Sequence, residues 1–244
     1  MNQFKISEIN VNLWNKRNVS FVPHSDVNII VGINGSGKTT LLNEIEKIAR
    51  LRLENEESCI YIPSVDNLQA RDKRQKATPL SQALDAYIYD MKSGPSLMYY
   101  RMSMLDASLS QQSRVRERIH NFCSLINSLF SDTGKHIEVE GNKFLIYSDG
   151  ILLPTDSLSS GEKQILLTLL RVFLLDERDS VILIDEPENS LDISWQYKLV
   201  DILVKLNPNA QYFITTHSPS IFSDGWGNNI IYMEDVTTPT DKSL

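Results

Sequence analysis

The chain has 244 residues, 24 Lys+Arg against 31 Asp+Glu, a formal net charge of -7 and only two cysteines. At roughly 100–200 residues per domain, this length predicts one large domain or one domain with an insertion. The acidic balance argues against a protein that coats nucleic acid by charge alone, although a local basic groove stays open. The two cysteines exclude a disulfide framework, and no apolar run is long enough to span a bilayer. We therefore expect a cytoplasmic location without membrane insertion.

The first third of the chain predicts several strands and a glycine-rich loop. Alternating apolar and polar residues predict a strand within 4–13 and a second short strand at 19–22. The apolar, β-branched run at 27–31 is typical of a buried strand. Residues 38–53 have helical spacing, and a further strand is predicted at 60–62.

Residues 64–134 differ in character and predict a helical subdomain. Helical patterns occur in 79–92 and 111–130, and no run resembles a buried strand. This segment holds two basic clusters: Arg71, Lys73, Arg74 and Lys76, and Arg114, Arg116 and Arg118. We interpret the clusters as solvated faces, with a partner or nucleic-acid surface as the alternative.

The remainder of the chain predicts an antiparallel segment followed by alternating strands and helices. Between 135 and 154, the turn signals Gly141-Asn142 and Asp149-Gly150 separate three apolar runs, which favours hairpins. Alternation resumes with a helix at 160–177, a strand at 180–184, a helix at 192–206, a strand at 210–214 and a strand near 229–233. Apolar strands that alternate with helices indicate a largely parallel sheet covered on both faces.

A phosphate-binding loop joins the apolar strand at 27–31 to the helix that follows it. The segment that fits G-x-x-x-x-G-K-[ST] is Gly32-Ile33-Asn34-Gly35-Ser36-Gly37-Lys38-Thr39. Glycines let successive N–H groups surround phosphates, and the helix adds the positive end of its dipole. We expect nucleotide binding by Asn34, Gly35, Ser36, Gly37, Lys38, Thr39 and Thr40. Lys38 would reach the β- and γ-phosphates, and the Thr39 hydroxyl would bind Mg²⁺.

Two acids end the apolar strand at 181–184. A carboxylate at the carboxyl end of such a strand lies at the crevice where ligands bind, so Asp185 is expected to hold Mg²⁺ with Thr39. Glu186 is expected to be the general base that polarises the attacking water. The alternative is that these acids only cap the next helix or turn.

A second anion-binding helix start is predicted at residues 159–162. Ser159, with Glu162 three residues later, fits a capping box before an amphipathic helix. A helix N-terminus of this kind is also able to bind an anion.

The motifs, in this order, resemble those of an ABC-type ATPase domain of the SMC/RecF/OLD-like (AAA_21-like) group. The resemblance implies that the signature residues Ser159, Ser160, Gly161 and Glu162 bind the γ-phosphate held by a second copy. Ser160, where the common family form has glycine, looks more like the SMC/RecF/OLD branch than a transporter. The resemblance further implies a D-loop at Leu191 and Asp192 on the dimer interface. It also implies a switch histidine at His217, which would contact the γ-phosphate and help to place the attacking water.

Two positions depart from that family pattern or leave alternatives open. The family carries a lid glutamine after the strand at 60–62, whereas this chain has Ser64 there, with Gln69 near enough to substitute. Trp14 is expected to pack in the core, with a place near the base or ribose as the alternative.

The expected fold is α/β, a P-loop NTPase of ABC-ATPase type with a mixed central sheet, an antiparallel subsheet and a helical insertion. We expect one domain over 1–244 with the insertion at about 64–134. The expected reaction is hydrolysis of ATP with Mg²⁺, in a homodimer that sandwiches two ATP molecules.

The dimer is expected to control a separate effector chain, because the chain ends about 25 residues past His217 and leaves no room for a nuclease domain. The sequence also resembles ATPases of anti-phage defence systems, so the effector is expected to be a nuclease of such a system. A RecF-like DNA-repair ATPase is the alternative, followed by the ATPase subunit of an ABC transporter.

Overall fold

The computed structural model describes residues 4–53, 56–64, 78–92, 94–105 and 107–240. The chain forms two compact units, one made of Met1–Ser64 with Glu177–Leu244 and the other of Val65–Asp176. Each unit is described by itself. The basic cluster at 71–76 and Gln69 lie outside the described residues.

A five-stranded parallel sheet is the centre of the first unit. Its strand order is β10-β3-β9-β8-β4, and every neighbouring pair is parallel. The strands are β3 (Val27–Val31), β4 (Cys59–Ile62), β8 (Ser180–Asp185), β9 (Ala210–Thr216) and β10 (Ile230–Tyr232). All residues of β8 and β9 are buried, as their continuous apolar runs predict for strands covered on both faces.

A smaller antiparallel sheet completes this unit, with the order β1-β2-β11. Its strands are β1 (Ile9–Leu13), β2 (Arg17–Phe21) and β11 (Thr237–Pro239). The central sheet was expected to be mixed. Among the described strands it is parallel throughout, and the antiparallel pairs of this unit form a separate sheet.

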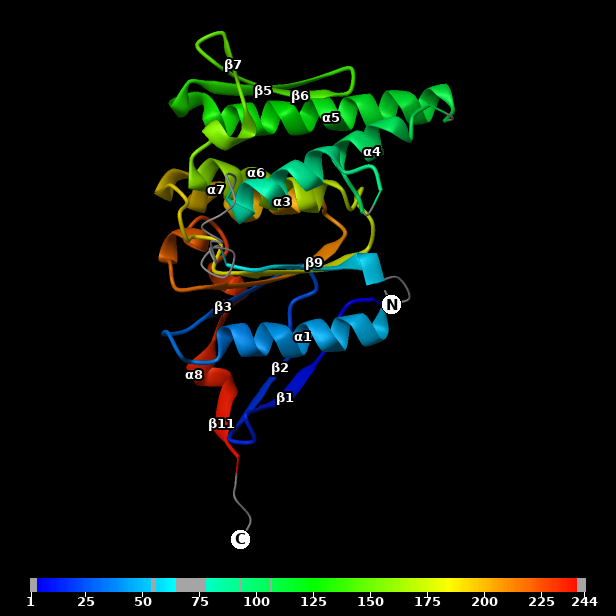
Figure 1. The fold of residues 1–244 in the computed structure, drawn as a ribbon. Coiled ribbons are helices and arrows are strands. Elements are labelled where there is room, and N and C mark those ends of the chain that lie inside the picture. The colour runs from blue at the N-terminus through cyan, green and yellow to red at the C-terminus, as the bar shows by residue number, and fades with distance from the viewer. Residues whose placement is uncertain (1–3, 54–55, 65–77, 93, 106, 241–244) are drawn as a thin grey trace. The chain divides into compact units, whose positions relative to one another are not determined.

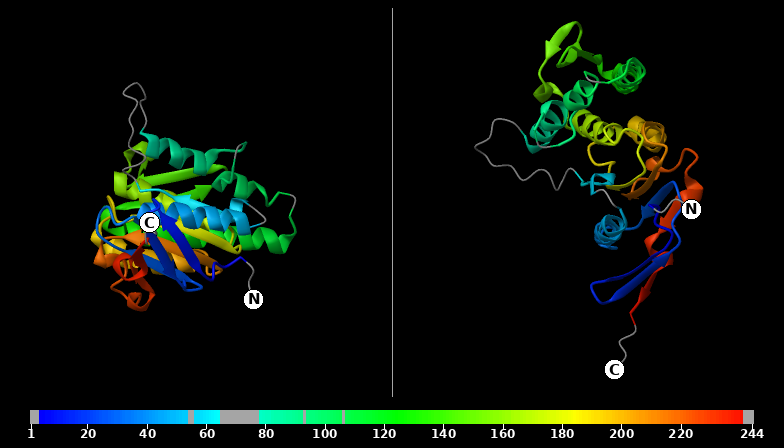
Figure 2. Two further views of the ribbon diagram at one scale, coloured as in Figure 1. Left: turned by 90° about the horizontal axis from the view of Figure 1, so that it is seen from below. Right: turned by 90° about the vertical axis from the view of Figure 1, so that its right-hand side faces the viewer.

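Helix α1 (Lys38–Arg52) lies between these two sheets (Figures 1 and 2). Its buried Leu41, Leu42 and Ile45 join one apolar cluster with residues of both sheets, such as Leu13 and Phe213. Helix α7 (Ile193–Leu206) lies on the other face of the parallel sheet. Shorter helical turns are η1 (Glu56–Ser58), η4 (Pro219–Ile221), η5 (Gly227–Asn229) and α8 (Met233–Val236).

Sequential residues of β9 show how the sheet contacts helices on both faces. Phe213 belongs to the cluster around α1, whereas the Tyr212 hydroxyl donates a 2.6 Å hydrogen bond to the Leu203 carbonyl of α7. Alternate side chains of a strand point to opposite faces, so this pattern follows from strand geometry. The parallel sheet is therefore packed between α1 and α7.

The second unit combines helices with an antiparallel sheet of order β5-β6-β7. Its helices are α3 (Pro79–Tyr89), α4 (Leu97–Met102), α5 (Leu109–Phe130) and α6 (Ser160–Phe173). Its strands are β5 (Lys135–Glu140), β6 (Lys143–Ser148) and β7 (Ile151–Leu153), with the turns η2 (Ser131–Thr133) and η3 (Thr155–Ser157). In Figure 1, α5 runs along the β5–β6 hairpin.

The expected helical insertion at about 64–134 lies inside this longer unit, which continues to Asp176. The extension arises because the hairpin packs on α5: Asn127 of α5 exchanges two hydrogen bonds with Ile137 of β5. The hairpin and the signature helix α6 therefore cluster with the helices. The assignment of the whole chain to one domain stays a prediction.

The basic cluster on α5 is not a uniform solvated face. Arg118 is nearly buried; it contacts the Tyr100 hydroxyl and Asp176 at 3.1 Å and lies over the Phe173 ring. Arg114 pairs with the same aspartate at 3.4 Å. Two of the three arginines therefore hold this unit together, so the interpretation of the cluster as a solvated face was wrong for Arg118.

No helix in the described part of the chain is long and apolar enough to cross a membrane.

Candidate functional site

The phosphate-binding loop lies between β3 and α1, as the sequence predicts. Gly35 and Gly37 have φ values of +79° and +103°, a region that residues with a Cβ rarely adopt, so the loop needs glycine at these places. Gly37 is the N-cap of α1, and no side chain makes a capping hydrogen bond there. The first N–H groups of the helix therefore have no side-chain cap at the loop. The structure thus has the glycine-rich turn and the helix start without a side-chain cap that the motif predicts.

A cavity of about 350 Å³ opens at this loop, entirely within the first unit. It is lined by Trp14, Asn34, Gly35, Gly37, Lys38, Thr39, Thr40 and Glu186. All of the predicted nucleotide-binding residues except Ser36 therefore line one cavity, together with the Glu186 carboxylate and the Trp14 indole. Ser36 does not line the cavity; its hydroxyl is buried and has no hydrogen-bond partner among the described residues.

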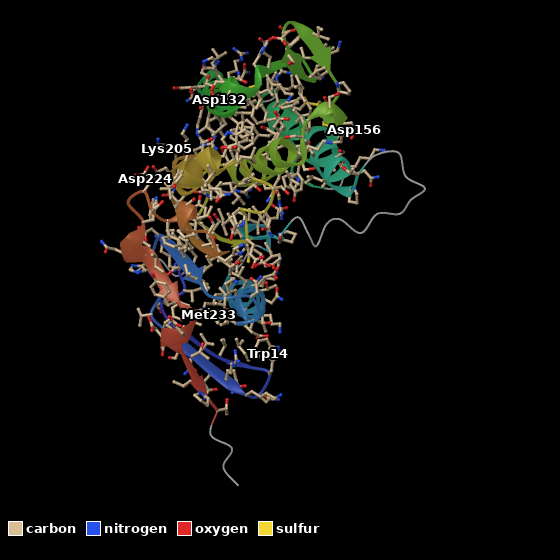
Figure 3. The ribbon with its side chains drawn as sticks, turned by 90° about the vertical axis from the view of Figure 1, so that its left-hand side faces the viewer. Trp14, Asp132, Asp156, Lys205, Asp224 and Met233 are labelled. Carbon is tan, nitrogen blue, oxygen red and sulfur yellow. The ribbon has the colours of Figure 1, made fainter. Side chains whose placement is uncertain are left out.

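Trp14 does not lie where the sequence predicts. It was expected to pack in the core, but half of its surface is exposed and its indole lines the cavity. Trp14, which is labelled in Figure 3, and Asn15 both have positive φ in the turn between β1 and β2. A Cβ on Gly37 would lie 2.9 Å from the Trp14 ring, so the indole sits directly on the loop.

Lys38 is buried and points back along its loop. Its Nζ donates to the Gly32 carbonyl at 2.9 Å and lies 3.4 Å from Glu186 Oε1. A cation in this position provides a point charge at the centre of the loop, the role that a phosphate-binding lysine needs.

Asp185 ends β8 beside Thr39, the first turn of α1. The Thr39 hydroxyl lies 2.9 Å from Asp185 Oδ2, and the Thr215 hydroxyl of β9 donates to Oδ1 at 2.6 Å. The Tyr61 hydroxyl of β4 donates at 3.3 Å, and burial together with the negative charge of Asp185 raises the pKa of Tyr61. Three hydroxyl groups thus contact the Asp185 carboxylate. The sequence predicts the contact with Thr39 but carries no signal for those with Tyr61 and Thr215.

Glu186 has a strained backbone, with φ at +46°. Its N–H lies 3.1 Å from both the carbonyl and the hydroxyl of Thr215, and these bonds hold the residue in this conformation. Its carboxylate faces Lys38, Asn189 Nδ2 at 3.5 Å and His217 Nδ1 at 3.9 Å. The structure therefore places the predicted base and the predicted switch histidine side by side.

His217 follows β9 and contacts a second acid that the site prediction missed. Its Nδ1 lies 3.2 Å from Glu188 Oε1, nearer than it lies to Glu186. The same oxygen accepts the backbone N–H of His217 at 2.8 Å. One sequence carries no signal for this contact, because Glu188 and His217 lie 29 residues apart.

Ser64, the expected lid position, is buried and is connected to Glu186 through Asn189. The Asn189 amide donates to Ser64 Oγ at 2.9 Å and lies 3.5 Å from Glu186 Oε2. Asn189 is a second residue that the sequence analysis missed. The alternative lid residue Gln69 lies outside the described residues.

The expected D-loop begins α7. Leu191 is buried, and Asp192 is the N-cap, whose carboxylate accepts the Ser194 N–H at 2.8 Å. These hydrogen bonds lower the pKa of the exposed Asp192. Ile193, which follows, is an apolar side chain that keeps 60% of its surface exposed.

The signature segment lies in the second unit, at the start of α6. Ser159 and Glu162 form the predicted capping box, with N–H bonds of 3.2 and 2.7 Å. Glu162 is buried and also accepts from Lys135 Nζ at 2.8 Å. Burial opposes its ionisation, but the hydrogen bonds from Lys135 and the Ser159 N–H together hold the pKa of Glu162 below its usual value.

The signature helix therefore starts in a fixed conformation. Ser160 is exposed at its first turn, and Gly161 is buried. The Lys135 contact, which ties this start to β5, had no signal in the sequence because the two residues are 27 positions apart.

The family described as "AAA domain, putative AbiEii toxin, Type IV TA system" matches residues 101–223. The chain is 24% identical, over 76% of its length, to "Achromobactin transport ATP-binding protein CbrD" of Dickeya dadantii, of which it spans 60%. It is 26% identical, over 83% of its length, to "Putative ABC transporter ATP-binding protein MG015" of Mycoplasma genitalium, of which it spans 30%.

The fold has a counterpart among solved structures. A structure described as "Crystal structure of the SmcHead bound to the C-winged helix domain of ScpA" matches with a TM-score of 0.52 at 14% identity, over 85% of this chain and 86% of the other. The fold is therefore that of an ABC/SMC-type P-loop domain, as expected.

Proposed function

The chain belongs to the AAA_21 family of AAA domains, and on that premise we propose that it is a MgATP-dependent ATPase acting as a nucleotide-gated dimer. One observation carries the proposal. The phosphate loop, its buried lysine and an acid with a strained backbone all line a single cavity of about 350 Å³. Strained residues persist where the surrounding structure holds them, and they concentrate at functional sites.

The nucleotide binds with its phosphates in the loop and its base on Trp14. The loop N–H groups and the start of α1 hold the phosphates, with Lys38 at the β- and γ-positions. The half-exposed Trp14 indole offers an aromatic face for the adenine. Arg17 lies over this ring at 5.9 Å and adds a cation beside it.

The residues at the carboxyl end of β8 fit a magnesium ion. Thr39 offers a hydroxyl and Asp185 a carboxylate, 2.9 Å apart, and oxygen ligands of this kind are the ones Mg²⁺ prefers. When bound, the ion neutralises charge on the β- and γ-phosphates. Tyr61 and Thr215 keep the Asp185 carboxylate oriented toward Thr39.

Hydrolysis follows from the position of Glu186. A water that attacks the γ-phosphorus transfers a proton to the Glu186 carboxylate while the bond to the bridging oxygen breaks, which yields ADP and phosphate. His217 stabilises the γ-phosphate, and Lys38 balances the charge that develops on its oxygens. Ser64 and Asn189 take the place of the lid, because Asn189 connects Ser64 to Glu186.

A second copy completes the site. The start of α6, with the exposed Ser160 and its fixed capping box, is an anion-binding helix N-terminus that contacts the γ-phosphate held by the partner. Leu191 and Asp192 line the interface, with Ile193 exposed beside them. ATP then becomes part of the interface, and its hydrolysis releases the dimer.

Substitution of the base tests this function. Glu186→Gln keeps the shape of the site but removes the proton acceptor, so we expect hydrolysis to fall by about 10²–10⁴-fold. The variant should form an ATP-dependent dimer, measured by light scattering with size-exclusion chromatography, and the wild type should form it only transiently. A variant that stays monomeric with MgATP and hydrolyses at the normal rate would contradict the proposal.

The dimer controls a separate effector chain, for which we take a nuclease of an anti-phage system as the working assignment. The family description, which names a putative toxin of a Type IV TA system, supports a partner protein. A RecF-like role in DNA repair is the alternative; it requires that DNA stimulate hydrolysis, with a steep loss of stimulation as salt rises.

A transporter ATPase is the second candidate, because the two curated relatives carry transport names. The serine at position 160 and the missing lid glutamine argue against it. Affinity purification of Glu186→Gln with ATP from the native host separates the candidates. A cytosolic nuclease partner supports the first, and membrane permease subunits support the second.

A further inference from the structure

A second cavity, of about 510 Å³, lies within the second unit and shares no lining residue with the cavity at the phosphate loop. One wall is a face of α5 and the other is the segment 137–140 of β5; we call this space the α5–β5 groove. Binding sites commonly have volumes of about 300–1,000 Å³, so the groove is large enough to hold a ligand. The lining residues of α5 include Arg116, Ile119, His120, Cys123 and Ser124.

The β5 wall of the groove is the free edge of a strand. Among the described strands, β5 lies at the end of its sheet and pairs only with β6. Side chains of a strand alternate between its two faces, so four consecutive residues can line one cavity only along the edge of the strand. The groove therefore follows the edge of β5 from Ile137 to Glu140.

Helix α5 covers this edge at one residue and leaves it open at another. The Ile137 N–H donates to Asn127 Oδ1 at 2.6 Å, and the Ile137 carbonyl accepts from Asn127 Nδ2 at 3.0 Å, so both groups of Ile137 point away from β6. In an antiparallel pair this direction alternates along the strand, so the N–H and carbonyl of Val139 point to the same outer side. Neither group has a partner there among the described residues. Unpaired groups at a strand edge are a template for a further strand.

The two walls of the groove carry opposite charges. Glu138 and Glu140 are exposed on one face of β5, whereas Arg116 and His120 are exposed on the same face of α5, four residues apart. Arg116 differs from the other two arginines of the α5 cluster, because it has no ion-pair partner in the part of the chain that the structure describes. The same holds for Glu140. A ligand that complements the groove therefore needs both charges.

We propose that the α5–β5 groove binds an extended segment of a partner protein, which adds to β5 as a further strand at Val139. Side chains of the segment that lie beside Glu138 and Glu140 are basic, because opposite charges are favoured across a strand pair. The side chains between them point to the opposite face, along which α5 runs (Figure 1), and are acidic, toward Arg116 and His120. Main-chain hydrogen bonds then provide affinity and alternate side chains provide specificity. This inference does not require the proposed ATPase function.

A phage-displayed library of random linear peptides is the probe for this site. The library is selected on the intact wild-type chain without nucleotide, so binding is measured apart from ATP chemistry. We expect the enriched peptides to alternate acidic and basic residues. If no peptide is enriched above the bare support, the groove is not a peptide site and the inference fails.

The backbone contact is tested at Val139. Val139→Pro removes the outward N–H, and proline is tolerated on an edge strand where that group does not pair within the sheet. The Kd of an enriched peptide, measured by fluorescence polarisation, should rise by at least about 3- to 10-fold. Val139→Ala, the matched control, keeps the N–H and should change the Kd by less than about twofold.

Hydrogen exchange measured by NMR gives a second readout of the same contact. In the wild type, a bound peptide should slow the exchange of the Val139 N–H, because a strand partner protects it from water. Peptides that leave this exchange unchanged and bind Val139→Pro as tightly as the wild type would show that the strand edge is not the site.

The charge of the α5 wall is tested at Arg116. Arg116→Glu should weaken a peptide with acidic residues by about 3- to 10-fold, and a peptide with lysine at those positions should recover the affinity. Glu117→Lys, the matched control, reverses a charge one residue along the helix but outside the groove, and should change the Kd by less than about twofold. Equal affinities for Arg116→Glu and the wild type would overturn the inference. A chain that binds peptide but lacks ATPase activity would contradict only the proposed function.

Discussion

The orientation of Glu186, the proposed general base, depends on its backbone conformation as much as on its side chain. Glu186 is held at φ +46° by two bonds to Thr215, in the strand next to its own. This conformation turns the chain sharply after Asp185, so the carboxylates of the two consecutive residues contact different groups. One faces Thr39 and the other faces Lys38. Strain of this kind is tolerated where the neighbours over-determine the conformation.

The residue-scale prediction concerns Trp14 as the platform for the base. Trp14→Ala should weaken ATP binding by about 1–3 kcal/mol, roughly 5- to 150-fold in Kd, the range for base stacking on an aromatic side chain. Trp14→Phe, the matched control, should restore most of the affinity because it keeps an aromatic face. Isothermal titration calorimetry measures both variants. Equal affinities for the alanine and wild-type proteins would place the base elsewhere.

Residues near one another in the sequence were predictable, and residues joined only by folding were not. The loop residues, Asp185 and Glu186 follow from a local pattern with a stated chemistry. Glu188, Asn189 and Lys135 act through partners that lie far away in the chain, so one sequence carries no signal for their pairing. Trp14 was assigned to the core because large aromatic side chains are usually buried. The positive φ of its turn, which no composition rule detects, places it at the cavity instead.

At the scale of elements, the boundaries follow from capping and turn chemistry. The helix predicted at 160–177 begins at Ser160 because Ser159 and Glu162 form a capping box. It ends at Phe173, earlier than expected, and Asp176 and Glu177 then adopt positive φ. The periodic pattern continues past the helix because Leu174 and Leu175 are buried in the turn that follows. The six-residue α4 was missed, since so short a helix contains less than two turns of pattern.

The ion pair between β5 and the signature helix should stabilise this unit. Lys135 Nζ lies 2.8 Å from the buried Glu162, so Lys135→Met leaves that carboxylate without its charged partner. We expect a loss of about 1–3 kcal/mol in the free energy of unfolding at pH 7, measured by urea denaturation. Lys47→Met is the matched control; it breaks an exposed pair with Glu44 and should cost less than about 0.5 kcal/mol.

The difference in the free energy of unfolding between wild type and Lys135→Met should depend on pH in a defined direction. The pKa of Glu162 is lowered in the folded protein. The ionised Glu162 carboxylate therefore makes its full contribution to the free energy of unfolding above the unfolded pKa of about 4.3. The contribution is lost as the pH falls through the lower, folded value. The gap between wild type and Lys135→Met should therefore be constant from pH 7 to pH 5 and narrow below about pH 4. A gap that stays constant at low pH would show that the lysine acts through packing alone.

At the scale of the whole molecule, the chemistry divides between the two compact units. The phosphate loop, Asp185, Glu186 and His217 all belong to the first unit, and the signature segment belongs to the second. The sequence predicted both sets of residues from local motifs. The fold class also followed from the alternation of strands and helices, although the sequence did not show that parallel and antiparallel strands belong to separate sheets.

This division leads to a complementation test of the dimer. Lys38→Ala removes the phosphate lysine, and Ser160→Glu places an anion where the partner's γ-phosphate would lie, while still favouring the helix start. Each variant alone should be inactive. In an equal mixture half the dimers are mixed, and each holds one intact composite site, so about one quarter of wild-type ATPase activity should return. Ser160→Ala, the matched control, should stay active alone. A mixture as inactive as its components would show that the signature does not act across the dimer.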